Sequence, residues 1–197
     1  MKGKFHQYSA DTNDRRLIHV YFTIASVLFA YLLNWITQNT SLKIPWWLDA
    51  PAIFGFYGLI YLLFNNVLWK MRVIRLLFQI KTPDWNGDYK CVLRTSFDNF
   101  QSEKDLTIKI TQNWDSILIQ IKTNSSVSNS LSGSFSINDS SSPQFTYEYI
   151  NKPNNDAPFS MNIHYGMANI WIDSGLLKGE FFNGRGRNNY GTFQEIK

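Results

Sequence analysis

The sequence predicts a membrane α-hairpin followed by a small antiparallel β-barrel of about eight strands. Two apolar runs of 20 residues, Leu17–Ile36 and Ala50–Trp69, predict the hairpin because neither contains Asp, Glu, Lys or Arg. At about 1.5 Å per residue, each run forms a helix of about 30 Å, which matches the hydrocarbon core of a bilayer. After Asp84 apolar and polar residues alternate with a period of two, which is typical of half-buried strands.

The first run is predicted to be a retained membrane helix rather than a signal peptide. Its apolar stretch is longer than the roughly 7–15 residues of a signal-peptide core, and the residues after it lack the small side chains of a cleavage site. A short connection, about Thr37–Asp49, separates the two runs, so the two helices are expected to be antiparallel. His19 lies near one end of the first run and is interpreted as a structural residue at headgroup level.

Basic residues predict the orientation of the hairpin. Four Lys or Arg precede the first run and four follow the second, whereas the connection holds only Lys43. The positive-inside rule therefore places both termini in the cytoplasm. Lys70–Lys81 mixes cations with apolar residues at helical spacing, so it is expected to continue the second helix or to lie as an amphipathic segment on the inner leaflet. The predicted organisation is an N-terminal arm at 1–16, the hairpin at 17–69, a basic juxtamembrane linker at 70–83 and the barrel at 84–197.

Several residues of the hairpin are suited to contacts between helices. Asn34, Asn65 and Asn66 are costly to leave unpaired in hydrocarbon, although the last two can instead sit at the level of the inner headgroups. Gly55 and Gly58 predict a face that allows close packing of a neighbouring helix. These residues are candidates for contacts between protomers.

Strand signals fill the chain after Asp84. In Asp105–Thr111, Leu106, Ile108 and Ile110 share one face. Loops rich in Ser, Asn, Asp and Pro are predicted at 124–130, 139–143 and 152–158. About eight short strands make a small closed barrel, which can hold one small ligand. The candidate strands are Gly87–Thr95, Asp105–Thr111, Ser116–Thr123, Ser132–Asn138, Gln144–Asn151, Ser160–Tyr165, Ala168–Asp173, Leu176–Asn183 and Asn189–Ile196.

Charge is unevenly distributed along the chain. Residues 1–83 carry nine Lys or Arg against three Asp, a net +6, whereas residues 84–197 carry ten basic and twelve acidic residues, a net −2. A domain of this charge is not suited to coat a nucleic acid, so neither DNA nor RNA is predicted as a partner. The single cysteine, Cys91, can form no disulfide within the chain and is interpreted as a small core residue.

The sequence lacks a recognisable catalytic constellation. The three histidines, His6, His19 and His164, are far apart, and there is no metal-ligand spacing, nucleophile elbow or phosphate-binding Gly loop. The protein is therefore predicted not to be an enzyme and to use no metal or cofactor.

Arg185 and Arg187 are the leading candidates for anion binding. They flank Gly186 just after Asn183-Gly184, a strong hairpin signal, so an extended chain would direct both guanidinium groups to one side. Two such groups suit a phosphodiester, and the alternative is a solvated turn whose cations guard a sheet edge. Aromatic side chains could stack a base, although aromatic residues in strands are more often core. The predicted ligand-binding set is Arg185, Arg187, Tyr147, Tyr190, Trp114 and Arg94.

Motifs at both ends of the predicted barrel carry a resemblance to a known family. The barrel opens with Trp85-Asn-Gly-Asp-Tyr89 and closes with the stretch LKGEFFNGRGRNNYGTF at 177–193. With two membrane helices and a basic segment in front, the chain resembles the two-transmembrane, β-strand-rich effectors of bacterial cyclic-oligonucleotide-based anti-phage defence (CBASS). The opening motif is also similar to the start of lipocalin-like barrels, in which an aromatic residue plugs one end.

The resemblance implies a receptor in the bacterial inner membrane. A cognate nucleotidyltransferase would make a cyclic di- or trinucleotide on phage infection, and the barrel would bind it. The protein would then form a homo-oligomer whose helices disrupt the membrane lipid and kill the cell. Two other classes stay open: a membrane-tethered lipocalin-like barrel for a lipid or another apolar ligand, and a membrane-tethered nucleotide or lipid hydrolase.

Overall fold

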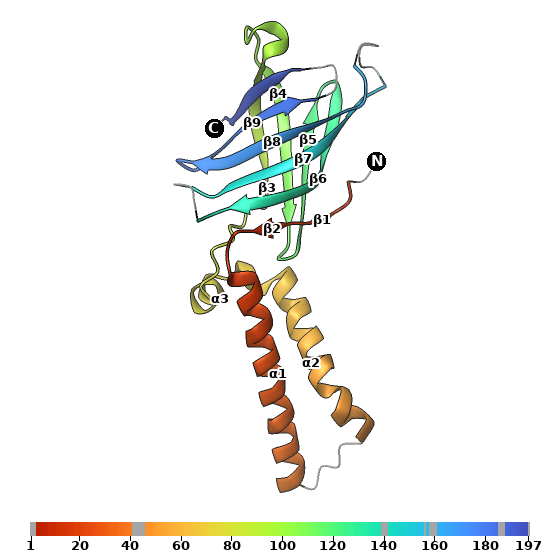
Figure 1. Ribbon diagram of the computed structural model, residues 1–197, viewed down its shortest axis with the longest axis vertical. Coiled ribbons are helices and arrows are strands. Elements are labelled where there is room, and N and C mark those ends of the chain that lie inside the picture. Colours follow the sequence, from red (N-terminus) through yellow and green to blue (C-terminus); the bar gives the residue numbers. More distant parts are fainter. Residues whose placement is uncertain are drawn as a thin grey trace. The chain divides into compact units, whose positions relative to one another are not determined.

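The computed structural model describes residues 3–40, 46–138, 142–155, 157, 161–184 and 188–196. The chain divides into two compact units, one of residues 12–81 and one that joins residues 1–11 to residues 82–197. The first unit is helical and the second is a barrel, and Figure 1 shows the elements of each.

The helical unit contains α1 (Asp14–Asn39), α2 (Trp46–Asn66), the 3₁₀ turn η1 (Leu68–Lys70) and α3 (Arg72–Leu77). Among the residues that the structure describes, α1 is the one helix long and apolar enough to cross a membrane. The 21 residues of α2 measure about 31 Å at a rise of about 1.5 Å per residue. Of the two alternatives for Lys70–Lys81, continuation of the second helix is wrong, because α2 ends at Asn66 and the chain passes through η1 before α3. The amphipathic segment on the inner leaflet stays a prediction.

Aromatic side chains pack α1 against α2. Phe22 is buried and meets Tyr61 and Phe64 edge to face, with ring centroids 6.2 and 5.1 Å away. One turn earlier, His19 Nδ1 lies 2.7 Å from the Tyr57 hydroxyl, and the His19 ring stacks on Tyr61. The contacts repeat at helical spacing on both helices, so a single face of each helix holds the hairpin together.

A buried carboxylate organises the start of α1. Asp14 accepts hydrogen bonds from the backbone N–H of Arg15 (2.9 Å) and of Lys81 (3.1 Å). A negative charge in the first turn of a helix is stabilised by the unpaired N–H groups there. Asp14 therefore joins the first and last residues of the helical unit.

Eight antiparallel strands form a closed barrel in the second unit. Neighbours in sequence pair all the way from β3 to β10, and β10 pairs with β3 to close the ring. Closure removes exposed sheet edges. The predicted barrel of about eight strands is confirmed. The strands are β3 (Gly87–Thr95), β4 (Lys104–Gln112), β5 (Ser116–Thr123), β6 (Ser126–Ser136), β7 (Gln144–Pro153), β8 (His164–Asp173), β9 (Leu176–Asn183) and β10 (Tyr190–Glu195).

Two predicted boundaries are wrong where polar or small residues point into the barrel. The predicted loop 124–130 is mostly strand, because β6 begins at Ser126 and buries serine hydroxyls instead of apolar side chains. The chain from His164 to Asp173 is one strand rather than parts of two. Gly166 interrupts its apolar pattern, because a Cβ there would lie 2.4 Å from the Tyr149 hydroxyl oxygen.

The first residues of the chain complete the barrel wall. β5 and β6 pair directly at Gln120–Lys122. Further along this seam, β1 (His6–Gln7) pairs antiparallel with β5, and β2 (Ser9–Ala10) pairs parallel with β6. Tyr8, between them, is 4% exposed and packs edge to face on Phe135 and Phe145. Part of the predicted N-terminal arm is thus built into the barrel.

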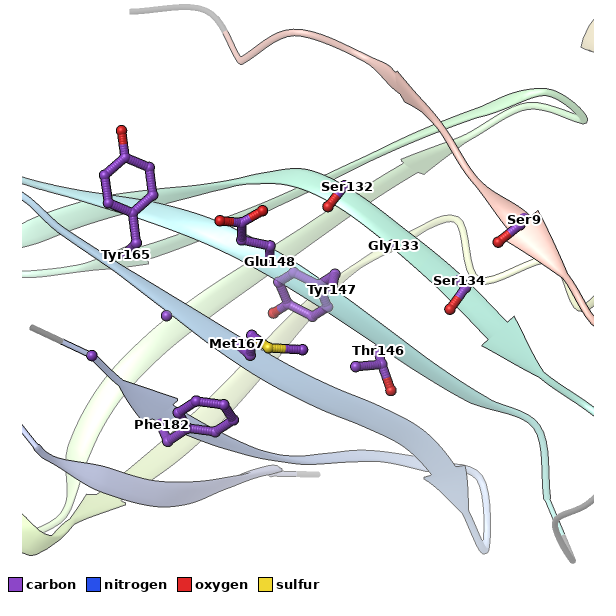
Figure 2. Close-up of a pocket in the computed structure, with 12 residues that line it drawn as sticks. Ser9, Ser132, Gly133, Ser134, Thr146, Tyr147, Glu148, Tyr165, Met167 and Phe182 are labelled. Atoms are coloured by element: carbon purple, nitrogen blue, oxygen red, sulfur yellow. The ribbon is translucent and has the colours of Figure 1, made fainter.

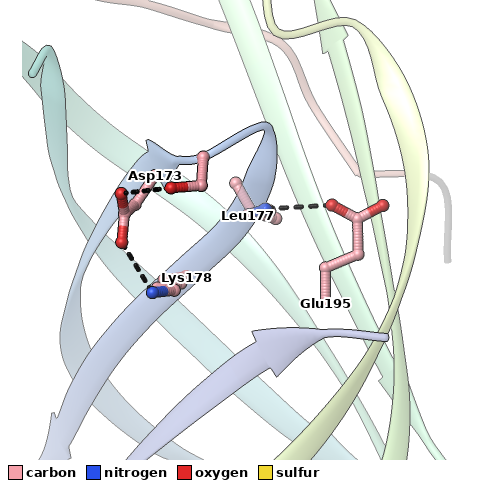
Figure 3. A network of polar contacts seen from close by, with 5 residues as sticks. Asp173, Leu177, Lys178 and Glu195 are labelled. Atoms are coloured by element: carbon pink, nitrogen blue, oxygen red, sulfur yellow. Dashed lines mark hydrogen bonds and ion pairs between the residues drawn. The ribbon is translucent and has the colours of Figure 1, made fainter. Parts of the chain in front are cut away.

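One end of the barrel is closed by its core. Trp85, Phe135, Phe145, Ile170 and Leu177 are all buried in one apolar cluster. The same end holds a polar network at the β8–β9 turn, shown in Figure 3. Asp173 accepts from the Ser174 hydroxyl (3.2 Å) and from Lys178 Nζ (2.6 Å), and Glu195 accepts from the backbone N–H of Leu177 (2.9 Å). These contacts attach β10 to the β8–β9 hairpin.

Candidate ligand-binding site at the open end of the barrel

The other end of the barrel holds a cavity of about 790 Å³, here called the mouth cavity. All eight barrel strands contribute side chains to it, from near the ends of β3, β5, β7 and β9, from near the starts of β4, β6 and β8, and from Phe193 of β10. Its volume lies within the range of about 300–1,000 Å³ that is typical of small-molecule sites. The closed barrel thus leaves a ligand-sized space at one end.

The deeper wall of the mouth cavity is apolar and aromatic. It is lined there by Leu106, Ile121, Ala168, Phe181 and Phe193, which face inward from five different strands. Planar rings among aliphatic side chains provide a surface on which a flat heterocycle can stack.

A hydrogen-bonded polar wall forms one side of the mouth cavity. Asn151 Nδ2 donates to Ser126 Oγ (3.0 Å) and Ser128 Oγ (2.8 Å). Thr123 Oγ1 in turn lies 3.1 Å from Ser126 Oγ and accepts from the backbone N–H of Ser126 (3.1 Å). Asn151 Oδ1 is buried and has no hydrogen-bond partner among the described residues. The wall is therefore held by hydrogen bonds among its own side chains, which leave this one buried acceptor unpaired.

A second polar group lies on the neighbouring strands. The Tyr149 hydroxyl donates to Asn183 Oδ1 at 2.6 Å, and both residues line the mouth cavity. Burial raises the pKa of Tyr149 above its usual value, so the phenol stays protonated and acts as a donor. His164 Nδ1 lies 3.0 Å from the Asn162 carbonyl oxygen. Because a carbonyl only accepts, this nitrogen carries a proton.

Charged groups lie at the rim of the mouth cavity. The charged side chains among its described lining residues are Glu103, Lys104 and Asp105. Lys104 Nζ lies 3.7 Å from an Asp98 carboxylate oxygen and 5.5 Å from the Phe97 ring centre. The described lining thus carries two carboxylates and one ammonium group, and Lys104 is partly neutralised by Asp98.

A second hollow, of about 570 Å³, lies over the outer surface of β6 to β9 (Figure 2). Ser132 and Ser134 lie along β6 on one side of it, and Met167 and Phe182 lie on the other. Glu148 is its one charged residue among the described lining. The mouth cavity is larger and its described lining includes a cation, Lys104, so it is the better candidate for a nucleotide.

The predicted pair Arg185 and Arg187 lies outside the described residues. The residues on either side of the pair are described: Asn183 and Asn189 both line the mouth cavity. The backbone N–H of Asn183 donates to the Asn189 carbonyl oxygen at 2.8 Å. The described chain therefore reaches the mouth cavity at Asn183 and again at Asn189.

The other four predicted ligand-binding residues lie apart from one another, and none is among the described lining of the mouth cavity. Tyr147 is fully buried in the core beneath Tyr149, and Trp114 is buried in the β4–β5 turn. Arg94 points outward, where its Nε donates to Glu103 Oε1 at 3.0 Å. Tyr190 is 58% exposed and its ring centre lies 5.6 Å from that of Phe100. Ligand contact by these residues stays a prediction, while the geometry favours other side chains.

The polar residues of the cavity wall were absent from the predicted set. Asn151, Ser126 and Ser128 occupy inward positions at strand ends, where a period-two pattern normally places apolar residues. Small polar residues at inward positions are the signal that could have identified them. The sequence pattern alone does not show that these polar residues meet. The register of β6 on β7 shows it, because Ser128 is paired with Asn151 in that register.

Comparisons with known proteins identify the family of both units. Residues 16–70 match the family model described as "Cap15, TM helices", and residues 80–197 match the model described as "Cap15, cyclic dinucleotide receptor domain". The chain is also similar to the CD-NTase-associated protein 15 of Yersinia aleksiciae, with 29% identity over 140 residues. That match covers 70% of this chain and 65% of the length of the relative.

Among the described residues, no group of three His, Cys, Asp or Glu side chains could hold a metal ion. The resemblance to two-transmembrane effectors of CBASS, inferred from the motifs at both ends of the barrel, is confirmed by the two family models and the relative. The chain is a membrane protein that belongs to the Cap15 family, with a helical membrane part and a β-barrel cyclic dinucleotide receptor domain.

Proposed function

We propose that this protein binds a cyclic dinucleotide in the mouth cavity and acts as a membrane-bound effector, not as an enzyme. The observation that carries the proposal is the mouth cavity itself, which lies in the part of the chain matched by the receptor-domain model. The aromatic rings of its deeper wall suit stacking with a base, and the hydroxyl and amide groups of its polar wall suit the polar atoms of a nucleotide.

The polar wall also argues against a lipid as ligand. An apolar ligand would cover the Asn151 and Asn183 amides and the serine hydroxyls without offering hydrogen bonds to them. These groups bond one another within the protein, yet they still form a polar surface to which a hydrocarbon chain offers no hydrogen bond and a nucleotide does. The lipocalin-like alternative is therefore disfavoured by the chemistry of this lining.

Arg185 and Arg187 are proposed to bind the phosphodiesters. The described lining supplies one cation, Lys104, which already interacts with Asp98. Two guanidinium groups on a loop bounded by Asn183 and Asn189 would supply the positive charge that a cyclic dinucleotide needs.

Ligand binding is proposed to drive formation of a homo-oligomer that disrupts the bacterial inner membrane, with both termini in the cytoplasm. In this scheme a cognate nucleotidyltransferase makes the nucleotide during phage infection, and loss of membrane integrity kills the infected cell. The family model named for transmembrane helices spans both α1 and α2. A Cβ at Gly55 or Gly58 would meet no described atom within 4 Å, so no described part of the chain covers this surface of α2, and it is available to a second copy.

Calorimetric titration of the detergent-solubilised full chain with cyclic dinucleotides tests the binding site. The double variant Arg185→Ala plus Arg187→Ala is expected to bind at least about 10-fold more weakly, because two charge-assisted contacts to phosphate are lost. Lys109→Ala plus Lys122→Ala, which removes the same charge from exposed positions of β4 and β5, is the matched control and should bind normally. Unchanged affinity of the arginine variant, or an equal loss in the control, would remove the pair from the site.

A further inference from the structure

We propose that α3 and the basic residues beside it form a binding site for anionic phospholipid at the surface of the membrane. Val73, Leu76 and Leu77 enter the apolar edge of the bilayer, and Lys70 and Arg72 bind lipid phosphates. The site belongs to the helical unit, so the proposal does not depend on what the barrel binds. It gives the protein a contact with the leaflet surface in addition to the helices that cross the membrane.

One face of α3 exposes large apolar side chains. Val73, Leu76 and Leu77 are 72%, 82% and 69% exposed. They are three and four residues apart, so they lie next to one another on the helix surface. Met71, immediately before the helix, is also exposed. Apolar side chains gathered in this way are typical of a surface that another molecule or a membrane covers.

Phe78, the residue after α3, attaches the helix to the hairpin. Its ring meets Phe22 of α1 and Phe64 of α2 edge to face, with ring centroids 6.3 and 6.5 Å away. Gln79 then has a φ of 51°, the left-handed conformation in which a helix commonly ends. α3 is therefore fixed beside the end of the hairpin where α1 begins and α2 ends, with its apolar face left uncovered by the described residues (Figure 1).

The ends of the hairpin are expected at the headgroup layers of a membrane. α1 is long and apolar enough to cross a bilayer. α2 runs antiparallel to it, because Phe22 contacts Phe64 whereas Phe29, further along α1, stacks on Phe56. Five residues separate the end of α2 from the start of α3. Interfacial helices bury their apolar face about 5–10 Å into the boundary of the bilayer, and α3 lies at the level that this requires.

Basic side chains surround the apolar face of α3 without acidic partners. Lys70, Arg72 and Lys81 are exposed, and no carboxylate of the described residues lies within ion-pair distance of them. Residues 60–81 contain neither Asp nor Glu. Asp14, at the start of α1, is buried and accepts from backbone N–H groups instead. The counter-ions of these cations must therefore come from outside the helical unit.

Charge favours a lipid leaflet over a second copy of the chain as the molecule that covers α3. A symmetric contact through α3 would place its cations against the same cations of the partner, and like charges repel. An anionic leaflet instead supplies phosphates to basic residues close to a membrane helix, and hydrocarbon to the apolar side chains between them.

A nitroxide probe at position 76 shows what covers the apolar face. The full chain carries Leu76→Cys with the probe, and Cys91→Ala so that one thiol remains, in phospholipid nanodiscs. Thr107→Cys, at an exposed position of β4, is the matched control. Collisions with oxygen, which dissolves in hydrocarbon, are compared with collisions with a water-soluble nickel complex. The oxygen-to-nickel ratio at 76 should exceed the ratio at 107 by at least about 10-fold.

Lipid retention tests the basic residues. The full chain is purified at limiting detergent from phosphatidylcholine that contains about one quarter phosphatidylglycerol, and the retained lipids are measured by mass spectrometry. Phosphatidylglycerol should be enriched at least about 3-fold over the mixture, and Lys70→Gln plus Arg72→Gln should remove at least about half of that enrichment. Lys109→Gln plus Lys122→Gln removes the same charge from exposed positions of β4 and β5 and should leave it unchanged.

Each of four results would overturn the proposal. Free collision of the probe at 76 with the nickel complex would place α3 in water, and shielding from both reagents would show that protein covers it. No enrichment of phosphatidylglycerol by the wild type, or equal enrichment by the Lys70 and Arg72 variant, would show that these cations do not bind the lipid. None of these measurements uses a cyclic dinucleotide, so they leave the proposed function to its own test.

Discussion

At the scale of single residues, the barrel interior changes from apolar to polar along its length. Cys91 lies in the apolar part, where it is 1% exposed and belongs to the core cluster. Burial raises the pKa of its thiol to about 12, and the charge of Glu195 adds to the effect. The interpretation of Cys91 as a small core residue is confirmed, and the low thiolate fraction makes it chemically inert in the folded protein.

Cys91 therefore reports on the integrity of the barrel. At pH 8, we expect a maleimide to label the native protein on the order of 100-fold more slowly than the urea-unfolded protein, because the thiol is buried and protonated. The neutral thiol favours the fold, so its contribution to stability is complete below about pH 9 and declines as the pH rises toward 12. Labelling of the native protein at the unfolded rate would contradict the buried position.

At the scale of elements, the segment 3–11 is the least expected part of the structure. Its two short strands occupy the seam between β5 and β6, and Tyr8 enters the core between them. The Tyr8 hydroxyl donates to the Asn113 carbonyl oxygen (3.2 Å) and accepts from Gln112 Nε2 (3.1 Å). Because α1 begins at Asp14, the chain leads directly from the barrel wall into the first long helix.

Tyr8 is accordingly expected to contribute to barrel stability. Tyr8→Ala should lower the free energy of unfolding by about 3 kcal/mol, through loss of a buried ring and the cavity it leaves. Tyr8→Phe, which keeps the ring and loses the hydroxyl, should lower it by about 1 kcal/mol. Urea unfolding of the detergent-solubilised chain, followed by tryptophan fluorescence, measures both. Equal stability of Tyr8→Ala and wild type would show that the segment is not part of the folded wall.

The elements differ in how far sequence patterns could predict them. Strands Gly87–Thr95, Ser116–Thr123 and Leu176–Asn183 were predicted to the residue, because their apolar inward faces give a clear period of two. β6 was predicted too short because its inward residues near the mouth are serines. The two strands within residues 6–10 are two residues each, which is too short to show any periodicity in the sequence. They form because β5 and β6, which are distant in sequence, offer backbone partners to them.

The same limit applied to the candidate site. The arginine pair was visible as a motif, whereas the wall of Asn151 and the β6 serines forms only when β6 pairs with β7. A polar residue at an inward strand position has a meaning only after its cross-strand neighbours are known. Register, rather than composition, decides the chemistry of this cavity.

At the scale of the whole molecule, residues 1–83 carry a net charge of +6 and residues 84–197, which form the eight barrel strands, a net charge of −2. A ligand can shift the assembly of such a protein only by binding the assembled form more tightly than the separate chains. The mouth cavity supplies the ligand site in this account, and the uncovered surface at Gly55 and Gly58 supplies a place for helix contacts between copies.

Sedimentation velocity of the detergent-solubilised full chain, with and without the cyclic dinucleotide that binds most tightly, shows whether the nucleotide drives assembly. We expect a shift to a larger species at saturating nucleotide, and no shift when the Arg185→Ala plus Arg187→Ala variant is given the same concentration. An unchanged sedimentation coefficient for the wild type, under conditions where calorimetry shows the cavity to be occupied, would contradict it.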